Sequence, residues 1–197
     1  MVILGVASGE VIDLLCEFLG VAIHHILQIR NIYPAEIFER RRHFNVPVQW
    51  IRHPELREYI HSAVTNLHPL IRQGHVEKFV VTFLDSKQTV VEKFVFKLNL
   101  NQAFGAAVPI NDMEYALRGF LIKLSSSESL MSPLPPDCSF EIVVYSKMLP
   151  GDAKGQGQFW ISADLQPWEQ PARITPIKSM CSDPLSVQLF IEHPSTS

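Results

Sequence analysis

Two adjacent histidines, His24 and His25, are the residues whose types first suggest a reactive site. Imidazole binds metal ions and acts as a general acid or base near neutral pH. The pair lies in an apolar run that predicts a helix, so the two rings point about 100° apart and do not chelate one ion as an i, i+4 pair does. We therefore expect one packed and one exposed histidine rather than a metal site.

The other nucleophiles and acids show no spacing typical of catalysis. The sequence contains no G-x-S-x-G motif and no glycine-rich phosphate loop. Cys16, Cys138 and Cys181 form no C-x-x-C pair, which argues against a zinc ribbon or a redox dithiol and favours a reducing compartment. These patterns predict no enzyme, no metal and no cofactor. A small hydrolase with an unrecognised site is the alternative from another class.

Composition and charge narrow the class of protein further. The chain has 197 residues, of which 47% are hydrophobic and 19% charged, so one globular domain is expected. Its net charge is −3, which argues against strong direct binding of nucleic acid. The densest basic run, Arg40-Arg41-Arg42, is too short to change this. No basic residue precedes the apolar start, and Glu17 interrupts the longest apolar run, so we expect a soluble intracellular protein without a membrane span.

The elements that position these residues follow from hydrophobic periodicity. Helical spacing of apolar residues predicts helices over 9–30, from Pro54 to Gly74, and around Met113–Leu124. Residues 35–52 are predicted to be irregular. VEKFV occurs at 76 and again at 91 around the polar turn DSKQT, which predicts an antiparallel hairpin rather than a stacking repeat. In it Phe79 faces the core, with Lys78, Thr82, Lys93 and Lys97 on a face partly open to water.

The C-terminal quarter has a different character. After a strand around 140–145, residues 148–158 are rich in glycine and predict a hinge. Residues 159–192 contain four prolines and end in the alternating strand VQLFI. Because proline cannot donate to a sheet ladder, this tail is expected to lie along a sheet edge or to wrap the domain. Two tryptophans, Trp160 and Trp168, stand in it and suggest that it contacts something large. Three helices on one face of an antiparallel sheet give an α+β fold.

Several stretches carry a resemblance to a known family. They are LLCEFLGVAIHHIL, IYPAEIFERRRHFNVPVQ, HPELREYI, VEKFVF, LRGFLIKL and VQLFIE. Together they resemble the HORMA-domain family, and within it the branch of small accessory subunits of DNA polymerase zeta. The resemblance extends from about residue 10 to residue 192. It implies one HORMA domain, 1–197, with a core over about 9–147, a hinge over 148–158 and a C-terminal "safety belt" over 159–192.

The resemblance also implies partners. The belt would trap a Pro-rich peptide of the polymerase zeta catalytic subunit, while another surface binds the C-terminal domain of a Y-family scaffold polymerase during translesion synthesis. A second HORMA protein, a second copy of the chain and a HORMA-remodelling AAA+ ATPase are further implied partners. The location would be the nucleus, with the cytoplasm as a second compartment. Spindle-checkpoint or chromosome-axis signalling is the alternative adaptor role.

Six residues of this sequence match family positions with a role. Tyr59 and Trp160 match positions that hold the peptide's prolines, and aromatic faces suit proline rings. Ile174, Gln188 and Phe190 match the surface for the scaffold polymerase, and the alternation of VQLFI independently places Gln188 and Phe190 on one face. Arg118 matches a residue of self-association. The sequence departs from the family pattern at Ser162, in the belt, and at Asn31, which replaces an acidic residue expected opposite Arg118.

Overall fold

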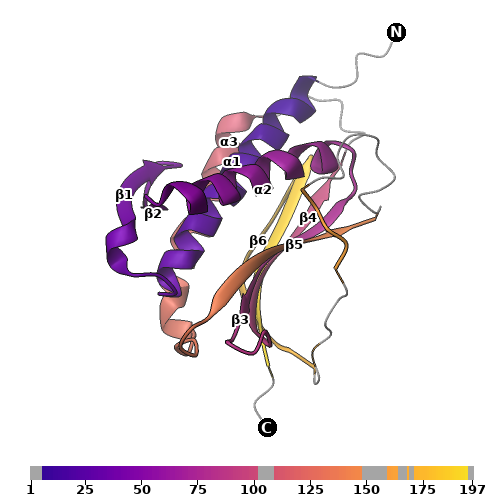
Figure 1. Cartoon of the computed structure of the whole chain (residues 1–197). Coiled ribbons are helices and arrows are strands. Elements are labelled where there is room, and N and C mark those ends of the chain that lie inside the picture. Colours follow the sequence, from indigo (N-terminus) through magenta and orange to yellow (C-terminus); the bar gives the residue numbers. More distant parts are fainter. Residues whose placement is uncertain (1–5, 102–108, 148–158, 164–167, 169–170, 195–197) are drawn as a thin grey trace.

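The computed structural model describes residues 6–101, 109–147, 159–163, 168 and 171–194, and the predicted hinge at 148–158 lies outside them. The elements are α1 (Val6–Ile29), β1 (Phe38–His43), β2 (Val46–Ile51), α2 (Pro54–Arg72), β3 (Val76–Leu84), β4 (Val90–Leu100), α3 (Ile110–Ser127), β5 (Ser139–Ser146), β6 (Arg173–Ser182) and β7 (Leu185–His193). Five strands form an antiparallel sheet in the order β5-β3-β4-β7-β6. The three helices cover one face of it, which confirms the predicted α+β architecture (Figure 1).

Helix α1 forms the centre of the core. Its apolar stripe is fully buried, at 0% exposure for Val11, Leu15, Phe18, Leu19, Ala22, Ile23, Ile26 and Leu27. Phe18 lies edge-on to Phe44, Phe96 and Phe120. It therefore links the turn between β1 and β2, strand β4 and helix α3. By length and composition alone the stretch Gly9–Ile29 is apolar enough to cross a membrane, contrary to the expectation from its interrupting polar residues. In the structure most of that stretch is buried within the protein, as in a core helix.

The β3–β4 hairpin is antiparallel and has the predicted faces. Phe79 pairs with Phe96 and is fully buried, while Lys78 pairs with Lys97 on the opposite face. That opposite face, called here the outer face, is less open than predicted: Thr82 is 2% exposed and Lys93 9%. The prediction failed for Lys93 because its ammonium lies 5.0 Å from the ring centroid of Trp168, which comes from the C-terminal tail.

Two predictions about the N-terminal half are wrong. The region 35–52 is not irregular but contains a second antiparallel hairpin, β1–β2. His24 and His25 are both buried, at 2% and 5% exposure, rather than one packed and one exposed. The hairpin explains His24, because Trp50 of β2 stacks on its ring at 3.8 Å between centroids. His25 turns toward α3 instead, where its Nε2 lies 2.8 Å from Ser125 Oγ.

The proline-containing tail forms the hairpin β6–β7 at one edge of the sheet, as predicted. β7 pairs with β4, and β6 occupies the outside position with Pro176 opposite Phe190. Val187, Leu189 and Ile191 of β7 are at most 1% exposed, whereas Gln188 is exposed. The alternation in VQLFI therefore separates a core-facing side from an outer side.

Candidate functional site

The outermost strand β5 presents an open sheet edge. Among the described residues, β5 pairs with β3 and with no strand on its other side. Its sequence, SFEIVVYS, contains no proline and no lysine, which are the residues that commonly protect an edge from further pairing. A row of backbone N–H and C=O groups in this state can accept an additional strand.

Tyr59 lies beside this edge. Its ring is 40% exposed and packs edge-on against Phe140 of β5, with 5.9 Å between centroids. Tyr33 also packs edge-on against Phe140, with 6.4 Å between the ring centroids. Burial raises the pKa of the Tyr59 hydroxyl, and a backbone hydrogen bond with Ile142 opposes that change. Tyr59 is thus fixed to β5 while part of its ring faces solvent.

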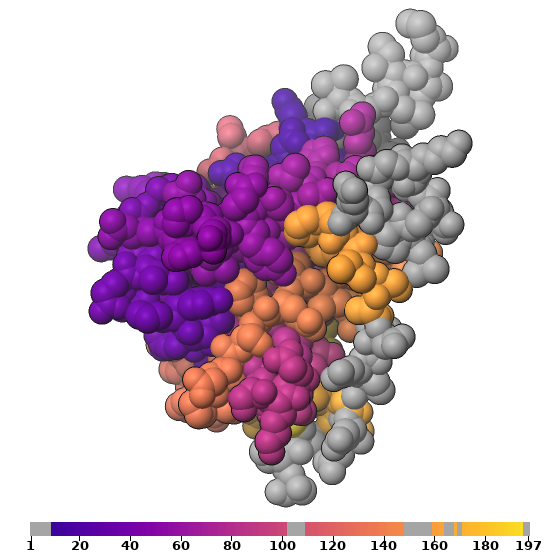
Figure 2. Space-filling model, viewed as in Figure 1, coloured from indigo at the N-terminus to yellow at the C-terminus, as the bar shows by residue number. Residues whose placement is uncertain are grey.

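Trp160 contacts α2, the helix that carries Tyr59. Its Nε1–H donates to the backbone oxygen of Asn66 on α2 at 3.2 Å, and its ring is edge-on to Phe159 at 5.1 Å. Asn66 follows Tyr59 by seven residues, a spacing that places both on one side of α2. Figure 2 shows residues 159–163 against α2, next to β5. Ser162, the departure from the family pattern, is exposed on this segment.

The three residues predicted for a second surface share one face. Strand register places Phe190 opposite Val95 and Gln188 opposite Lys97, so both side chains lie on the outer face of the sheet. Ile174 of β6 pairs with Glu192, which follows Phe190 by two residues and therefore shares its face. Phe190 is half-buried, whereas Ile174 is 59% exposed.

Arg118 lies on α3, away from the β5 edge, and makes contacts within its own chain. Its Nε donates to the backbone oxygen of Phe44 at 2.7 Å, and the guanidinium lies 5.1 Å from the Tyr115 ring centroid. Tyr115 is 70% exposed, so an aromatic ring and a cation stand together on the surface of this helix. Asn31 is exposed at the end of α1.

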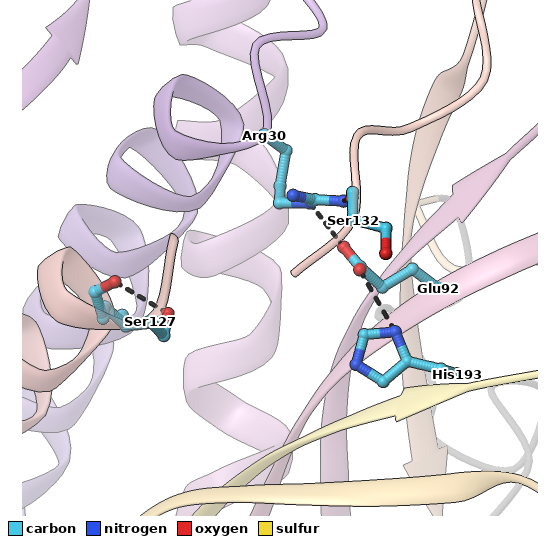
Figure 3. Close-up of polar contacts among 6 residues, drawn as sticks. Arg30, Glu92, Ser127, Ser132 and His193 are labelled. Atoms are coloured by element: carbon cyan, nitrogen blue, oxygen red, sulfur yellow. Dashed lines mark hydrogen bonds and ion pairs between the residues drawn. The ribbon is translucent and has the colours of Figure 1, made fainter. Parts of the chain in front are cut away.

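The C-terminal hairpin is held from both sides of the sheet, which the sequence did not reveal. On the helix side, Glu92 accepts a 2.6 Å hydrogen bond from Arg30 Nε and lies 3.4 Å from His193 Nδ1 (Figure 3). Burial raises the pKa of Glu92 to about 7, although the Arg30 charge and hydrogen bond act to lower it. On the outer face, Trp168 donates to Glu192 at 3.0 Å and covers Lys93.

None of these arrangements resembles a catalytic centre. Within the residues that the structure describes, no three His, Cys, Asp or Glu side chains are grouped to hold a metal ion. Burial lowers the pKa of His24 to about 3 and of His25 to about 4, so both rings are neutral core groups at physiological pH. The fold instead offers a binding surface at β5, made of backbone groups and aromatic side chains.

Comparison with known proteins places this geometry in a family. The model of the HORMA domain matches residues 12–158. The chain belongs to the HORMA-domain family. The sequence-based identification of this family is therefore confirmed.

Relatives extend over nearly the whole chain. A DNA polymerase zeta processivity subunit from Arabidopsis thaliana is 46% identical over 192 residues, covering 96% of this chain and 89% of the relative. The human mitotic spindle assembly checkpoint protein MAD2B is 37% identical over 193 residues, covering 93% and 92%. These HORMA relatives are adaptors and checkpoint proteins, so the chain is an adaptor and not an enzyme.

Solved HORMA structures share the fold at much lower identity. A chain of the mitotic checkpoint complex superposes with a TM-score of 0.78 at 18% identity, covering 94% of this chain and 99% of that one. C. elegans HTP-2 bound to HTP-3 closure motif 1 gives a TM-score of 0.75 at 12% identity, covering 97% and 89%. These similarities establish the fold of this HORMA protein and leave its ligands to be argued from its own residues.

Proposed function

We propose that this HORMA protein is the adaptor of a translesion polymerase, trapping a Pro-rich peptide of the polymerase zeta catalytic subunit and binding a Y-family scaffold polymerase elsewhere. The 46% identity to the Arabidopsis thaliana DNA polymerase zeta processivity subunit supports the polymerase assignment. The single structural observation that carries it is the open β5 edge, with Tyr59 packed on Phe140 of that strand and Trp160 held on the helix that carries Tyr59.

The peptide-binding step follows from the chemistry of this edge. An added strand would satisfy the outward backbone groups of β5. Tyr59 and Trp160 offer flat apolar faces, and a Pro-rich segment loses little conformational entropy on binding because it is already extended. In this proposal residues 159–192 form the belt, with Trp160 closing over the peptide while β6–β7 holds the end of the chain on the sheet.

The second partner would contact the outer face at Ile174, Gln188 and Phe190. An exposed isoleucine beside a half-buried phenylalanine and an exposed amide combines an apolar contact with a polar one, as binding patches do. Because β5 and β6 are opposite edges of the sheet, one partner at each edge can be bound together. The adaptor would thereby link two polymerases in the nucleus.

Arg118 and Tyr115 would serve self-association or pairing with a second HORMA protein, and a remodelling AAA+ ATPase would reopen the belt. The guanidinium already donates through Nε to Phe44, so its position is set before a partner arrives. Asn31 supplies no carboxylate to a facing Arg118, so we propose a weaker self-association than peptide binding.

The test is calorimetric titration of folded variants with each ligand. Tyr59→Ala and Trp160→Ala should weaken a Pro-rich peptide of the catalytic subunit by about 2 kcal/mol, roughly thirtyfold, and leave the scaffold domain's affinity unchanged. Phe190→Ala should do the reverse. Ile122→Ala, at an exposed isoleucine on α3, is the control and should change neither. Equal weakening of both ligands by every variant would show that the surfaces are not separate.

A second candidate is spindle-checkpoint signalling, which the name of the human relative favours. Affinity purification from cells with damaged DNA separates the two roles. Recovery of polymerase subunits supports the translesion role, and recovery of checkpoint proteins in their place supports the second candidate.

A further inference from the structure

Three lysines surround a cavity at one end of the sheet. The cavity has a volume of about 500 Å³ and lies where β3 begins and β4 and β5 end. Lys78, Lys97 and Lys147 line it together with one carboxylate, Glu77. Leu98, Leu185 and Ile71 also line it and are at most 7% exposed, so core side chains lie beneath part of it.

The positions of Lys78 and Lys97 are electrostatically unfavourable. Lys78 and Lys97 are directly opposite in the β3–β4 register, and like charges in that position repel each other. Among the described residues, none of the three ammonium groups forms an ion pair with a carboxylate. Lys78 instead lies 5.3 Å from the ring centroid of Tyr145. In a chain of net charge −3, this is a local concentration of positive charge.

The position of the cavity connects it to the β5 edge. Lys147 follows the last residue of β5, and its backbone N–H donates to His75 at 2.8 Å, which fixes the chain there. A strand added along β5 from the level of Phe140 would reach Lys147 after seven residues, or about 23 Å. A segment continuing beyond the end of β5 would therefore pass Lys147, which lines the cavity.

We propose that Lys78, Lys97 and Lys147 form a recognition site for a short acidic segment of a partner protein, at the place where a strand added to β5 leaves the sheet. The role of this site beside an added strand rests on the proposed function. The attraction of its lysines for carboxylates is independent of that function. The site takes carboxylates at the three lysines. Nucleic acid fits less well, because phosphate binding uses extended basic stripes and this site has three lysines at one cavity.

The direct test uses a fluorescent octapeptide of glutamate, a matched glutamine octapeptide and a single-stranded oligonucleotide as probes. The glutamate peptide should bind most tightly, and Lys78→Gln/Lys97→Gln/Lys147→Gln should weaken it at least about tenfold, which corresponds to about 1.4 kcal/mol. The double variant Lys97→Gln/Lys147→Gln, at exposed positions, serves if the triple variant does not fold. Lys123→Gln, an exposed lysine on α3, is the matched control. An unchanged affinity in the lysine variants, or tighter binding of the oligonucleotide through the same lysines, overturns the proposal.

A second measurement separates this site from the peptide-binding proposal. Tyr59→Ala should leave glutamate-peptide binding intact, so that measurement stands even if no Pro-rich peptide binds at β5. Where such a peptide binds, extending the end nearest Lys147 by four glutamates should strengthen it at least about threefold in the natural protein and not in the lysine variants. If extension at neither end strengthens binding, the placement beside β5 is wrong.

Discussion

The two edges of the sheet differ in how they are protected. At one edge, β6 contains Pro176 and a register shift between Pro176 and Lys178, features that discourage further pairing. At the other, β5 has neither proline nor lysine, and among the described residues nothing pairs with its outer side. Strand β6 therefore ends the sheet, whereas β5 is able to pair with a further strand.

This difference indicates where a partner adds and what stays in place. The β6–β7 hairpin is held by buried β7 side chains, by Glu92 between Arg30 and His193, and by Trp168 on the outer face. β5 has more solvent exposure and pairs on one side. Binding by strand addition at β5 therefore needs no rearrangement of the hairpin at the far edge.

The largest predicted effect compares a core contact of the β6–β7 hairpin with one of the edge strand β5. Leu189→Ala on β7, where the side chain is 1% exposed, should lower the free energy of unfolding by about 2–5 kcal/mol because it leaves a cavity. Val144→Ala on β5, where the side chain is half-buried, should cost about 1 kcal/mol. Chemical denaturation measures both. Equal losses would mean that the two edges are equally part of the core.

The next prediction concerns the pH dependence of stability that the buried titratable groups of the core produce. His24 and His25 have folded pKa values of about 3 and 4, below the usual 6.5, so their stabilisation is present above pH 6.5 and is lost as pH falls toward 4. Glu92 acts oppositely, since its pKa is raised to about 7 from 4.5 and its stabilisation grows as pH falls. From pH 6.5 to 4.5 the histidines lose about 4 kcal/mol and Glu92 returns about 2 kcal/mol.

The natural protein should therefore lose unfolding free energy over that interval, and the lowered pKa of His193 adds to the loss. His25→Gln removes about half of the contribution of His24 and His25, so it should lose about 2 kcal/mol less than the natural protein over the same range. Denaturant titrations at each pH measure this. A slope in the variant as steep as in the natural protein would show that His25 is not a neutral buried group.

The smallest predicted effect tests how Trp168 holds the hairpin. Trp168→Phe keeps a ring over Lys93 but removes the N–H that donates to Glu192, and should cost about 1 kcal/mol. Tyr115→Phe, at a 70% exposed position, is the control and should change stability little. If Trp168→Phe is as neutral as the control, the outer-face contact does not stabilise the hairpin.

The sequence predicted most of the framework because its periodic apolar residues have one compact solution. The α1 stripe and the β3–β4 hairpin with its two faces follow from spacing, and the edge position of the tail was one of two arrangements that its prolines allow. The β1–β2 hairpin was missed because FERRRH contains three consecutive arginines and its pairing depends on Trp50 stacking with His24. Burial of both histidines depends on that same tertiary contact.

The site was predictable in part. Tyr59, Trp160 and Phe190 could be named from the family resemblance, and the alternation in VQLFI placed Gln188 and Phe190 on a common face. The contact of Tyr59 with Phe140 and the ion pair between Arg30 and Glu92 could not, because each joins residues more than sixty positions apart in sequence. Likewise, the lysine cavity needs the β3–β4 register and the end of β5 together.

The most direct test of strand addition is hydrogen exchange at the two edges, with and without a Pro-rich peptide of the polymerase zeta catalytic subunit. The account predicts that the peptide slows exchange of outward-facing β5 amides between Ser139 and Ser146, while amides of β6 change little. The Trp160→Ala variant should show the same pattern at higher peptide concentration. Protection of β6 amides with β5 unchanged would contradict the assignment of β5 as the binding edge.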